Sequence, residues 1–205
     1  MGKKGVNMAQ VAQDAAATSR ESAAEQVSVL TGLTAATRHI ALLSAMLATC
    51  GSLYFSEVLR WIPCELCWYQ RILMYPLAVV LLVGILRDDR GLAWYGLPFS
   101  LSGIALSLYH YLQVIQLIPP AACVGLVPCG IDYLTPILTG PLSFIKIPFL
   151  ALVAFGLISV MLGNYALAGA PVPSAQGRRG SRVAAVVIVV VTILVFVGLG
   201  LLVGL

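Results

Sequence analysis

Charged side chains are scarce in this chain. Its 205 residues include 12 Lys or Arg and 8 Asp or Glu, so 10% are charged, whereas 60% are hydrophobic. Soluble domains are roughly a quarter charged, and this shortage therefore excludes an ordinary soluble protein. The sequence also contains no internal repeat. We expect an all-α integral membrane protein that folds as one compact helical bundle.

Five apolar segments are long enough to cross a bilayer, whose hydrocarbon core is about 30 Å thick and requires roughly 20 helical residues. They are residues 40–59, 68–86, 92–115, 144–162 and 183–205. The first four predict a four-helix transmembrane bundle. The last predicts an additional C-terminal transmembrane helix, almost uniformly aliphatic, for which we expect no chemical role.

Lys and Arg predict the orientation of the bundle, because cytoplasmic loops carry an excess of both. With the N-terminus inside, nine of the 12 lie on the inner side and three on the outer side. This topology places the loops at 60–67 and 116–143 outside a bacterial cytoplasmic (inner) membrane. The same asymmetry of loop charge accounts for the net charge of +4. We therefore expect the protein to contact membrane lipid and to have no nucleic-acid partner.

Composition divides the chain into four regions. Residues 1–37 are rich in Ala, Ser, Gln and Thr, which predicts a weakly ordered cytoplasmic extension. Residues 38–163 hold the four-helix core. Residues 164–182 are expected to form a cytoplasmic linker, because 170–182 is rich in Pro, Gly and Arg, and residues 183–205 form the added helix.

The most informative motif is the Cys-x-x-Cys pair of Cys64 and Cys67, where the first span ends and the second begins. Two thiols at this spacing can close a small disulfide ring and open it again. Cys67 starts a helix, where backbone N–H groups favour a thiolate, and Arg71 adds a positive charge one turn later. The motif favours a redox pair, with a structural disulfide and a metal site as alternatives.

A second pair, Cys123 and Cys129, lies in the long loop at 116–143. The five residues between them include Gly and Pro and allow a compact loop that closes a disulfide. Thiols outside the cytoplasm tend to pair, and exchange needs only a thiolate, an accessible sulfur and in-line approach. Two cysteine pairs on one side of the membrane predict a relay, in which thiol–disulfide exchange passes electrons from one pair to the other. A zinc or copper site made from all four cysteines, or two inert disulfides, are the alternatives. Cys50 is expected to be a small buried residue in a helix interface.

These motifs together resemble the disulfide bond formation protein B (DsbB) family. The resemblance rests on Pro-Cys-Glu-Leu-Cys at 63–67, Gln-Arg at 70–71, and the later pair Cys123 and Cys129. The gap between the later cysteines is most similar to the BdbC-type branch. The resemblance covers residues 40–163. The order of the motifs argues against vitamin K epoxide reductase-type proteins, in which the loop cysteines come first.

The resemblance implies a quinone-dependent thiol oxidase. Such a protein reoxidises an extracytoplasmic thioredoxin-like disulfide-forming protein (DsbA/BdbD-like) and passes the electrons to ubiquinone or menaquinone; the reverse direction, from a quinol, is an alternative. Carried over by position, Cys123 would be attacked by the reduced partner and Cys129 would exchange with Cys64. Cys67 would contact the quinone, and Arg71 would stabilise that thiolate and polarise a quinone oxygen.

Two further residues complete the predicted cofactor site. His110, near the outer end of the third span, could hydrogen-bond a quinone oxygen or move protons; otherwise it is an interfacial residue. Gln70 could orient its neighbour Arg71. Trp61 and Trp68 are expected to be interfacial anchors. The predicted catalytic residues are Cys64, Cys67, Cys123 and Cys129, the predicted cofactor-binding residues are Cys67, Arg71, His110 and Gln70, and no resident metal is expected.

Overall fold

The computed structural model describes residues 36–119, 128–129, 133–134, 140–171 and 175–204, with the side chains of 175 and 176 excepted. Over these residues the chain is helical and contains no strand. The first span is Ala36–Val58. The other elements are the π-helix η1 (Tyr54–Val58) that ends the first span, α2 (Glu65–Leu86), α3 (Leu92–Val114), the 3₁₀ helix η2 (Gly140–Leu142), α4 (Ile147–Leu167) and α5 (Ala175–Gly204).

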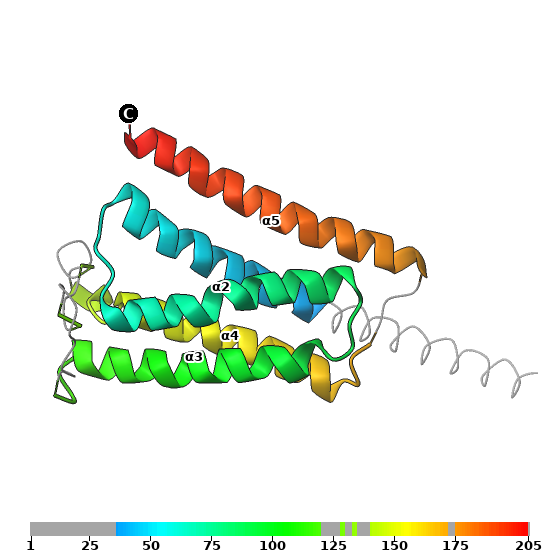
Figure 1. Cartoon of the computed structure of the whole chain (residues 1–205), viewed down its shortest axis with the longest axis horizontal. Helices are drawn as coiled ribbons and strands as arrows, with labels where there is room; N and C mark the ends of the chain where they lie inside the picture. Colours follow the sequence, from blue (N-terminus) through cyan, green and yellow to red (C-terminus); the bar gives the residue numbers. More distant parts are fainter. Residues whose placement is uncertain (1–35, 120–127, 130–132, 135–139, 172–174, 205) are drawn as a thin grey trace, which may run out of the picture.

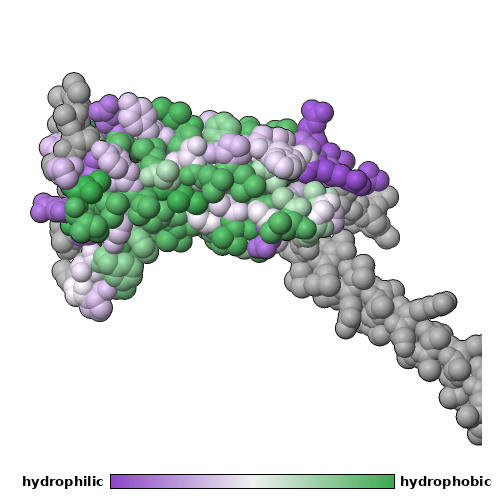
Figure 2. Space-filling model, turned by 90° about the horizontal axis from the view of Figure 1, so that it is seen from below, coloured by the Kyte–Doolittle hydropathy of each residue, from purple (hydrophilic) through white to green (hydrophobic). Residues whose placement is uncertain are grey.

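Five helices are long and apolar enough to cross a membrane, which confirms the predicted fold class. Figure 2 shows hydrophobic side chains along the length of the bundle and hydrophilic side chains mainly at its two ends. The protein is therefore a multi-pass membrane protein. Of the region expected to be weakly ordered, 1–37, all but the last two residues lie outside the described part of the chain.

The helix boundaries depart from the expected ones around α4 and α5. Lys146 is the N-cap of α4, and Pro148 lies in its first turn, where a proline loses no hydrogen bond and fits the helical φ. α5 begins at Ala175, within the segment expected to be a linker. Its first turns carry Arg178, Arg179 and Arg182, which are good helix formers and extend the helix beyond its apolar part.

A tight turn at 87–91 joins α2 to α3. Asp88 has a positive φ of 53°, a conformation that Asp tolerates better than most residues. The side chain of Asp89 accepts hydrogen bonds from the Gly91 N–H and the Tyr95 hydroxyl, and these donors, Tyr95 first, lower the pKa of the Asp89 carboxyl. We call this end of the bundle the turn end, and the opposite end, which carries Cys64, the cysteine end.

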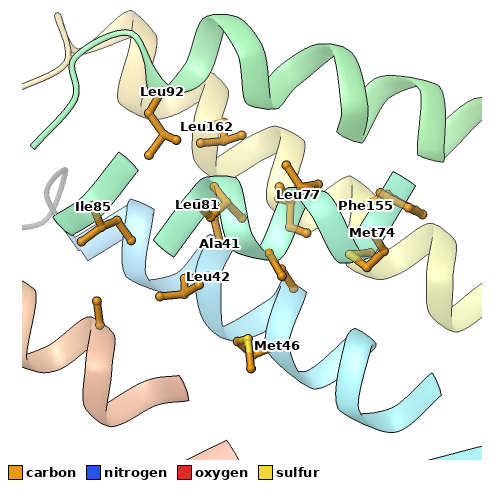
Figure 3. Close-up of a cluster of buried hydrophobic side chains, with 14 of the residues drawn as sticks. Ala41, Leu42, Met46, Met74, Leu77, Leu81, Ile85, Leu92, Phe155 and Leu162 are labelled. Carbon is orange, nitrogen blue, oxygen red and sulfur yellow. The ribbon is translucent and has the colours of Figure 1, made fainter. Parts of the chain in front are cut away.

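The core lies between the first span, α2, α3 and α4 (Figure 1). Figure 3 shows this cluster. Three of its members, Leu77, Leu81 and Phe155, are fully buried. At Gly103 of α3 a Cβ would lie 2.3 Å from a Phe155 ring carbon. Small residues let membrane helices approach closely, and Gly103 brings α3 and α4 together in this way.

α5 lies along the outside of the bundle, next to the first span (Figure 1). Most of its apolar side chains are exposed, and Ala185 and Thr192 are its buried residues. At the turn end Arg182 forms an ion pair with Asp88 at 3.1 Å. His39 Nε2 lies 2.9 Å from the backbone oxygen of Ser181. These contacts fasten α5 to the rest of the bundle.

Candidate active site

Cys64 and Cys67 lie together at the start of α2. Cys64 is the N-cap of this helix, and its sulfur accepts a hydrogen bond from the Cys67 N–H at 3.3 Å. This contact satisfies one of the backbone donors that every helix leaves unpaired at its start. The two Sγ atoms are 2.8 Å apart, and both residues are free thiols. The pair therefore needs only a small movement to close its disulfide.

His110 connects this pair to the second cysteine loop. Its Nε2 lies 3.6 Å from Cys64 Sγ and 3.1 Å from the backbone oxygen of Cys129. Its Nδ1 lies 3.2 Å from the side-chain nitrogen of Gln70. Because an amide nitrogen only donates, Nδ1 accepts there and Nε2 carries the hydrogen. Gln70 thus holds His110 in the form that donates to both the sulfur and the carbonyl oxygen.

The hydrogen-bond donors of the site converge on Cys64. They lower the pKa of its thiol from 9.0 to about 4. The largest cause is the hydrogen bond from the Cys67 thiol; burial opposes it, and the hydrogen bond from His110 adds to it. The sequence led us to expect the thiolate at Cys67, and this stays a prediction, although the Cys67 N–H and His110 Nε2 both face the Cys64 sulfur. The contact of Cys67 with a quinone stays a prediction.

Arg71 is held by the first span. Its Nη2 donates to the backbone oxygen of Ser52 at 2.9 Å, and its guanidinium carbon lies 5.3 Å from the centroid of the Trp68 ring. Gln70, expected to orient Arg71, instead hydrogen-bonds His110. Arg71 therefore receives its orientation from Ser52 and Trp68.

Both cysteines open onto a cavity of about 450 Å³, a size typical of small-molecule sites. Its walls are mainly apolar side chains of the first span, α2 and α4, and its polar groups include Arg71, Gln70 and His110. Leu47, Leu150 and Val153 line it and are 48%, 43% and 50% exposed, respectively. The cavity therefore borders the surface that faces lipid, and its lining fits a planar apolar molecule with hydrogen-bond acceptors.

An aromatic stack closes the cavity at the cysteine end. Phe55 stacks on Trp61 at 5.2 Å between ring centroids, and Trp61 stacks on Tyr133 at 5.3 Å. The Tyr133 hydroxyl donates to the backbone oxygen of Ile62 at 3.1 Å. All three rings line the cavity. This role was not predicted, and the only signal for it in the sequence is the position of Trp61 just before the motif.

Cys129 lies beside the first pair. It is 2% exposed and packs in one buried cluster with Cys64 and Leu66. It is also disulfide-bonded. Its predicted companion, Cys123, lies outside the described residues. Of the predicted site residues, the structure thus brings together Cys64, Cys67, Cys129, Gln70 and His110, with Arg71 in the same cavity wall.

A metal ion would find three ligand atoms here. The sulfurs of Cys64 and Cys67 and a ring nitrogen of His110 lie within 4.8 Å of one another. However, binding through Nε2 would move the hydrogen to Nδ1, which faces the amide nitrogen of Gln70. The Gln70 amide would have to rotate to present its oxygen. The site as built therefore suits exchange chemistry better than a resident metal.

Comparisons with known proteins agree with the motifs. A family model described as "Disulfide bond formation protein DsbB" matches residues 34–143. Disulfide bond formation protein C of Bacillus subtilis (strain 168) is 45% identical over 122 residues, which is 58% of this chain and 83% of that protein. A probable disulfide formation protein C of Halalkalibacterium halodurans is 47% identical over 120 residues, covering 58% and 84%.

A probable disulfide formation protein of Coxiella burnetii (strain CbuK_Q154) is 42% identical over 125 residues, which is 60% of this chain and 83% of that protein. No solved structure matches the chain. The matched segment, 34–143, covers more than half of the chain and contains both cysteine motifs. This protein therefore belongs to the DsbB family and is a membrane oxidoreductase of disulfide bond formation.

Proposed function

We propose that this protein reoxidises an extracytoplasmic thioredoxin-like thiol oxidase and passes the electrons to a membrane quinone. The observation that carries the proposal is the position of one cysteine pair between two surroundings. Cys64 packs against Cys129 of the second loop, and Cys64 and Cys67 also line the apolar cavity that borders lipid. Electrons entering from a soluble protein can therefore leave into a lipid-soluble acceptor.

The distribution of charge supports an outward-facing cysteine end. Arg182 and Asp88 meet at the turn end, and Arg178 and Arg179 lie on the same first turns of α5. An excess of Arg marks the cytoplasmic side of a membrane protein. In the proposed orientation the turn end is cytoplasmic and the cysteine end faces the partner oxidase, in a bacterial cytoplasmic membrane.

The first proposed step is exchange with the partner. A thiolate of the reduced partner attacks the disulfide between Cys123 and Cys129, forming a mixed disulfide with Cys123 and releasing the Cys129 thiolate. The second partner thiol resolves this mixed disulfide, so the partner leaves oxidised and the loop pair is reduced. Two electrons and two protons have then moved from the partner to the loop pair.

The second proposed step is exchange between the two pairs. The Cys129 thiolate attacks Cys64 in the Cys64–Cys67 disulfide, and Cys67 leaves as a thiolate. Cys123 then attacks Cys129, which restores the loop disulfide and leaves Cys64 and Cys67 as free thiols. The hydrogen on His110 Nε2 faces both the Cys64 sulfur and the Cys129 backbone, so His110 holds the two reacting loops together.

The third step reoxidises the first pair. A bound quinone supplies an acceptor for two electrons and two protons. Cys64, whose pKa is lowered to about 4, is the thiolate that recloses the bond onto Cys67. Arg71 offers N–H donors to an acceptor oxygen in the cavity. The apolar walls keep bulk water away from the sulfurs.

The proposed direction of electron flow rests on the reduction potentials of the partner, the protein disulfides and the quinone. A strongly oxidising thioredoxin-like partner stands at about −120 mV, and for a two-electron couple about 30 mV corresponds to about 1.4 kcal/mol. Protein disulfides at lower potential would run the exchange backward on their own. A quinone at higher potential removes the electrons and draws the sequence forward.

Quinone reduction by the purified protein in detergent, supplied with a reduced thioredoxin-like dithiol, tests this function. Wild type should turn over, and Cys67→Ser should not. Cys50→Ala is the matched control, because Cys50 is a buried thiol in the core of the first span and should leave turnover unchanged. Turnover by Cys67→Ser equal to wild type, or none by wild type with either ubiquinone or menaquinone, would contradict the proposal.

A soft-metal site is the second candidate, favoured by the cluster of Cys64, Cys67 and His110. It predicts a stoichiometric copper or zinc ion in the purified protein and no thiol-dependent quinone reduction. Elemental analysis of the same preparation separates the two functions. Metal that is lost in His110→Ala, together with absent turnover, would favour this candidate.

A further inference from the structure

The added helix α5 reaches the cavity. It begins at Ala175, beyond the segment 34–143 that matches the family model. The sequence led us to expect no chemistry from it. Nevertheless Phe196 of α5 is one of the residues that line the cavity, together with Cys67 and Arg71.

Small residues on the first span make this reach possible. Ala48, Gly51 and Ser52 all line the cavity and leave room between the first span and α5. A Cβ built at Gly51 would lie 3.8 Å from the tip of the Phe196 ring. The ring also meets Tyr54 edge to face, with centroids 6.1 Å apart. Phe196 thus occupies the space that a larger residue at 51 would fill.

The position of Phe196 is fixed from both ends of α5. At the turn end Arg182 pairs with Asp88 at 3.1 Å. Towards the cysteine end Gly200 lies close to the first span, where a Cβ would be 3.2 Å from a methyl carbon of Val58. These contacts set the register of the helix, and Figure 1 shows α5 alongside the first span. The ring is therefore a fixed part of the wall.

Phe196 also lies close to the group that holds Arg71. Gly51, at which a Cβ would lie 3.8 Å from the ring, directly precedes Ser52, whose backbone oxygen accepts a hydrogen bond from the Arg71 guanidinium at 2.9 Å. The lipid-facing border of the cavity is formed by Leu47 of the first span and by Leu150 and Val153 of α4. The apolar tail of a bound quinone can leave the cavity at this border, while its head-group ring lies near Arg71 and contacts Phe196.

We propose that α5 is part of the quinone site and that Phe196 is a quinone-binding residue that contacts the head-group ring. The inference rests on the proposed function. Aromatic rings attract one another in stacked or edge-to-face arrangements, and Phe196 presents such a surface in the cavity that the Arg71 donors also line. The fifth helix thereby sets the affinity for quinone in a bundle that otherwise has four helices.

Direct binding of quinone tests the inference without turnover. A decyl-substituted benzoquinone, titrated into the oxidised protein in detergent, should quench the fluorescence of Trp61, which lines the cavity. Phe196→Ala should raise Kd about fivefold to tenfold, because an aromatic contact is lost. Leu194→Ala is the control, since Leu194 is on the same helix and 63% exposed, and its Kd should equal that of wild type.

Two further variants guard against an unfolded Phe196→Ala. Phe196→Leu keeps apolar volume and should weaken binding about threefold. Gly51→Leu puts a side chain where the ring lies and should weaken binding to a similar extent as Phe196→Ala. In steady-state assays the KM for quinone should rise with kcat unchanged, the pattern of lost binding to both ground and transition states.

The outcomes separate this inference from the proposed function. Wild-type binding of the decyl-benzoquinone with an unchanged Kd in Phe196→Ala and Phe196→Leu overturns the role of α5 and leaves the function standing. No quinone binding by wild type removes the proposed function itself. An equal loss in Phe196→Ala and Leu194→Ala would mean that α5 only stabilises the bundle, and would also overturn the inference.

Discussion

The two ends of the bundle both bury polar side chains, but they satisfy them differently. At the cysteine end, Cys64, His110 and Gln70 form a continuous chain of hydrogen bonds. At the turn end, Arg38 is fully buried, and its guanidinium stands over the ring of Tyr165 at 5.0 Å. None of its three nitrogens has a hydrogen-bond partner within the described structure.

The difference suggests that the cysteine end carries the reactive groups, whereas the polar residues of the turn end hold helices together. Buried polar groups are costly unless they are paired. At the cysteine end the pairing positions a thiolate and a donor beside a cavity. At the turn end, the polar side chains Arg38, Asp88 and Arg182 connect helices to one another. Among the described residues, no free thiol lies beside them. Changes at one end should therefore alter turnover, and changes at the other should alter stability.

The largest effect should come from Cys64→Ser. Without this sulfur neither exchange between the pairs nor closure of the first disulfide is possible, so turnover should fall at least about a thousandfold. The unfolding temperature should change little, because the serine oxygen can still cap α2. Quinone reduction and thermal unfolding of the same preparation measure both. A large loss of stability would blur the contrast between the two ends.

The next effect concerns the pH dependence of the Cys64 thiolate. Its pKa is lowered to about 4, so the thiolate is populated at neutral pH and is lost only as the pH falls toward about 4. The stabilisation that this ionisation gives to the fold is complete only above the ordinary thiol pKa of 9.0, decreases as the pH falls below that value, and is gone below about 4, because the unfolded chain binds the proton throughout this range while the folded chain does not. The rate of alkylation of Cys64 by iodoacetamide against pH reports the thiolate.

His110→Ala sharpens this prediction. His110 is one of the causes of the lowered pKa, so its removal should raise the pKa of Cys64 and shift the alkylation profile to higher pH. Turnover should fall about tenfold or more, and most strongly at acidic pH. Gln70→Leu, which removes the amide at Nδ1, should give a smaller shift in the same direction. An unchanged profile in both variants would contradict the donor role of His110.

A change of stability without a change of turnover is expected from Arg38→Met. A buried charge that lacks hydrogen bonds costs free energy, and replacement by an apolar side chain of similar length removes a penalty of about 1–3 kcal/mol. The unfolding temperature in detergent should rise, and quinone reduction should stay at the wild-type rate. Tyr165→Phe, which keeps the ring beneath Arg38, is the control. A loss of turnover in Arg38→Met would break the separation of the two ends.

The smallest effect should come from Arg182→Gln. The ion pair with Asp88 is 3.1 Å long; the Asp88 side chain is only 6% exposed, but Arg182 is 49% exposed, so solvent screens the pair and we expect it to contribute about 1 kcal/mol. Thermal unfolding should shift by only a few degrees, and by less at high salt. A loss of quinone binding as large as that of Phe196→Ala would mean that this ion pair alone positions α5.

The spans were predictable because hydropathy is a local property. Each apolar run contains enough information to identify its helix, as at 68–86, which became Glu65–Leu86. The boundary of α5 was less predictable, because its first turns are polar and their helical state depends on continuation from the apolar part. The gap between 129 and 140 remains largely outside the described residues.

The site was predictable where one motif carried it. Cys64, Cys67 and Arg71 lie within eight residues, and their common position follows from helical geometry. The contact between Gln70 and His110 joins residues 40 positions apart, and only the packing of α2 against α3 determines it. The entry of Phe196 into the cavity likewise depends on how α5 packs against Gly51, which no local pattern specifies.

The aromatic stack of Phe55, Trp61 and Tyr133 gives the two proposed binding events a shared structural element. Phe55 belongs to the first span, while Tyr133 belongs to the loop that carries Cys129. If the proposed quinone contacts the stack from the cavity and the proposed partner oxidase contacts Tyr133 or its neighbours, both act on these rings. Their binding free energies are then coupled, and the coupling is equal in both directions. Whatever factor a bound quinone applies to the affinity for the partner, the docked partner must apply to the affinity for quinone.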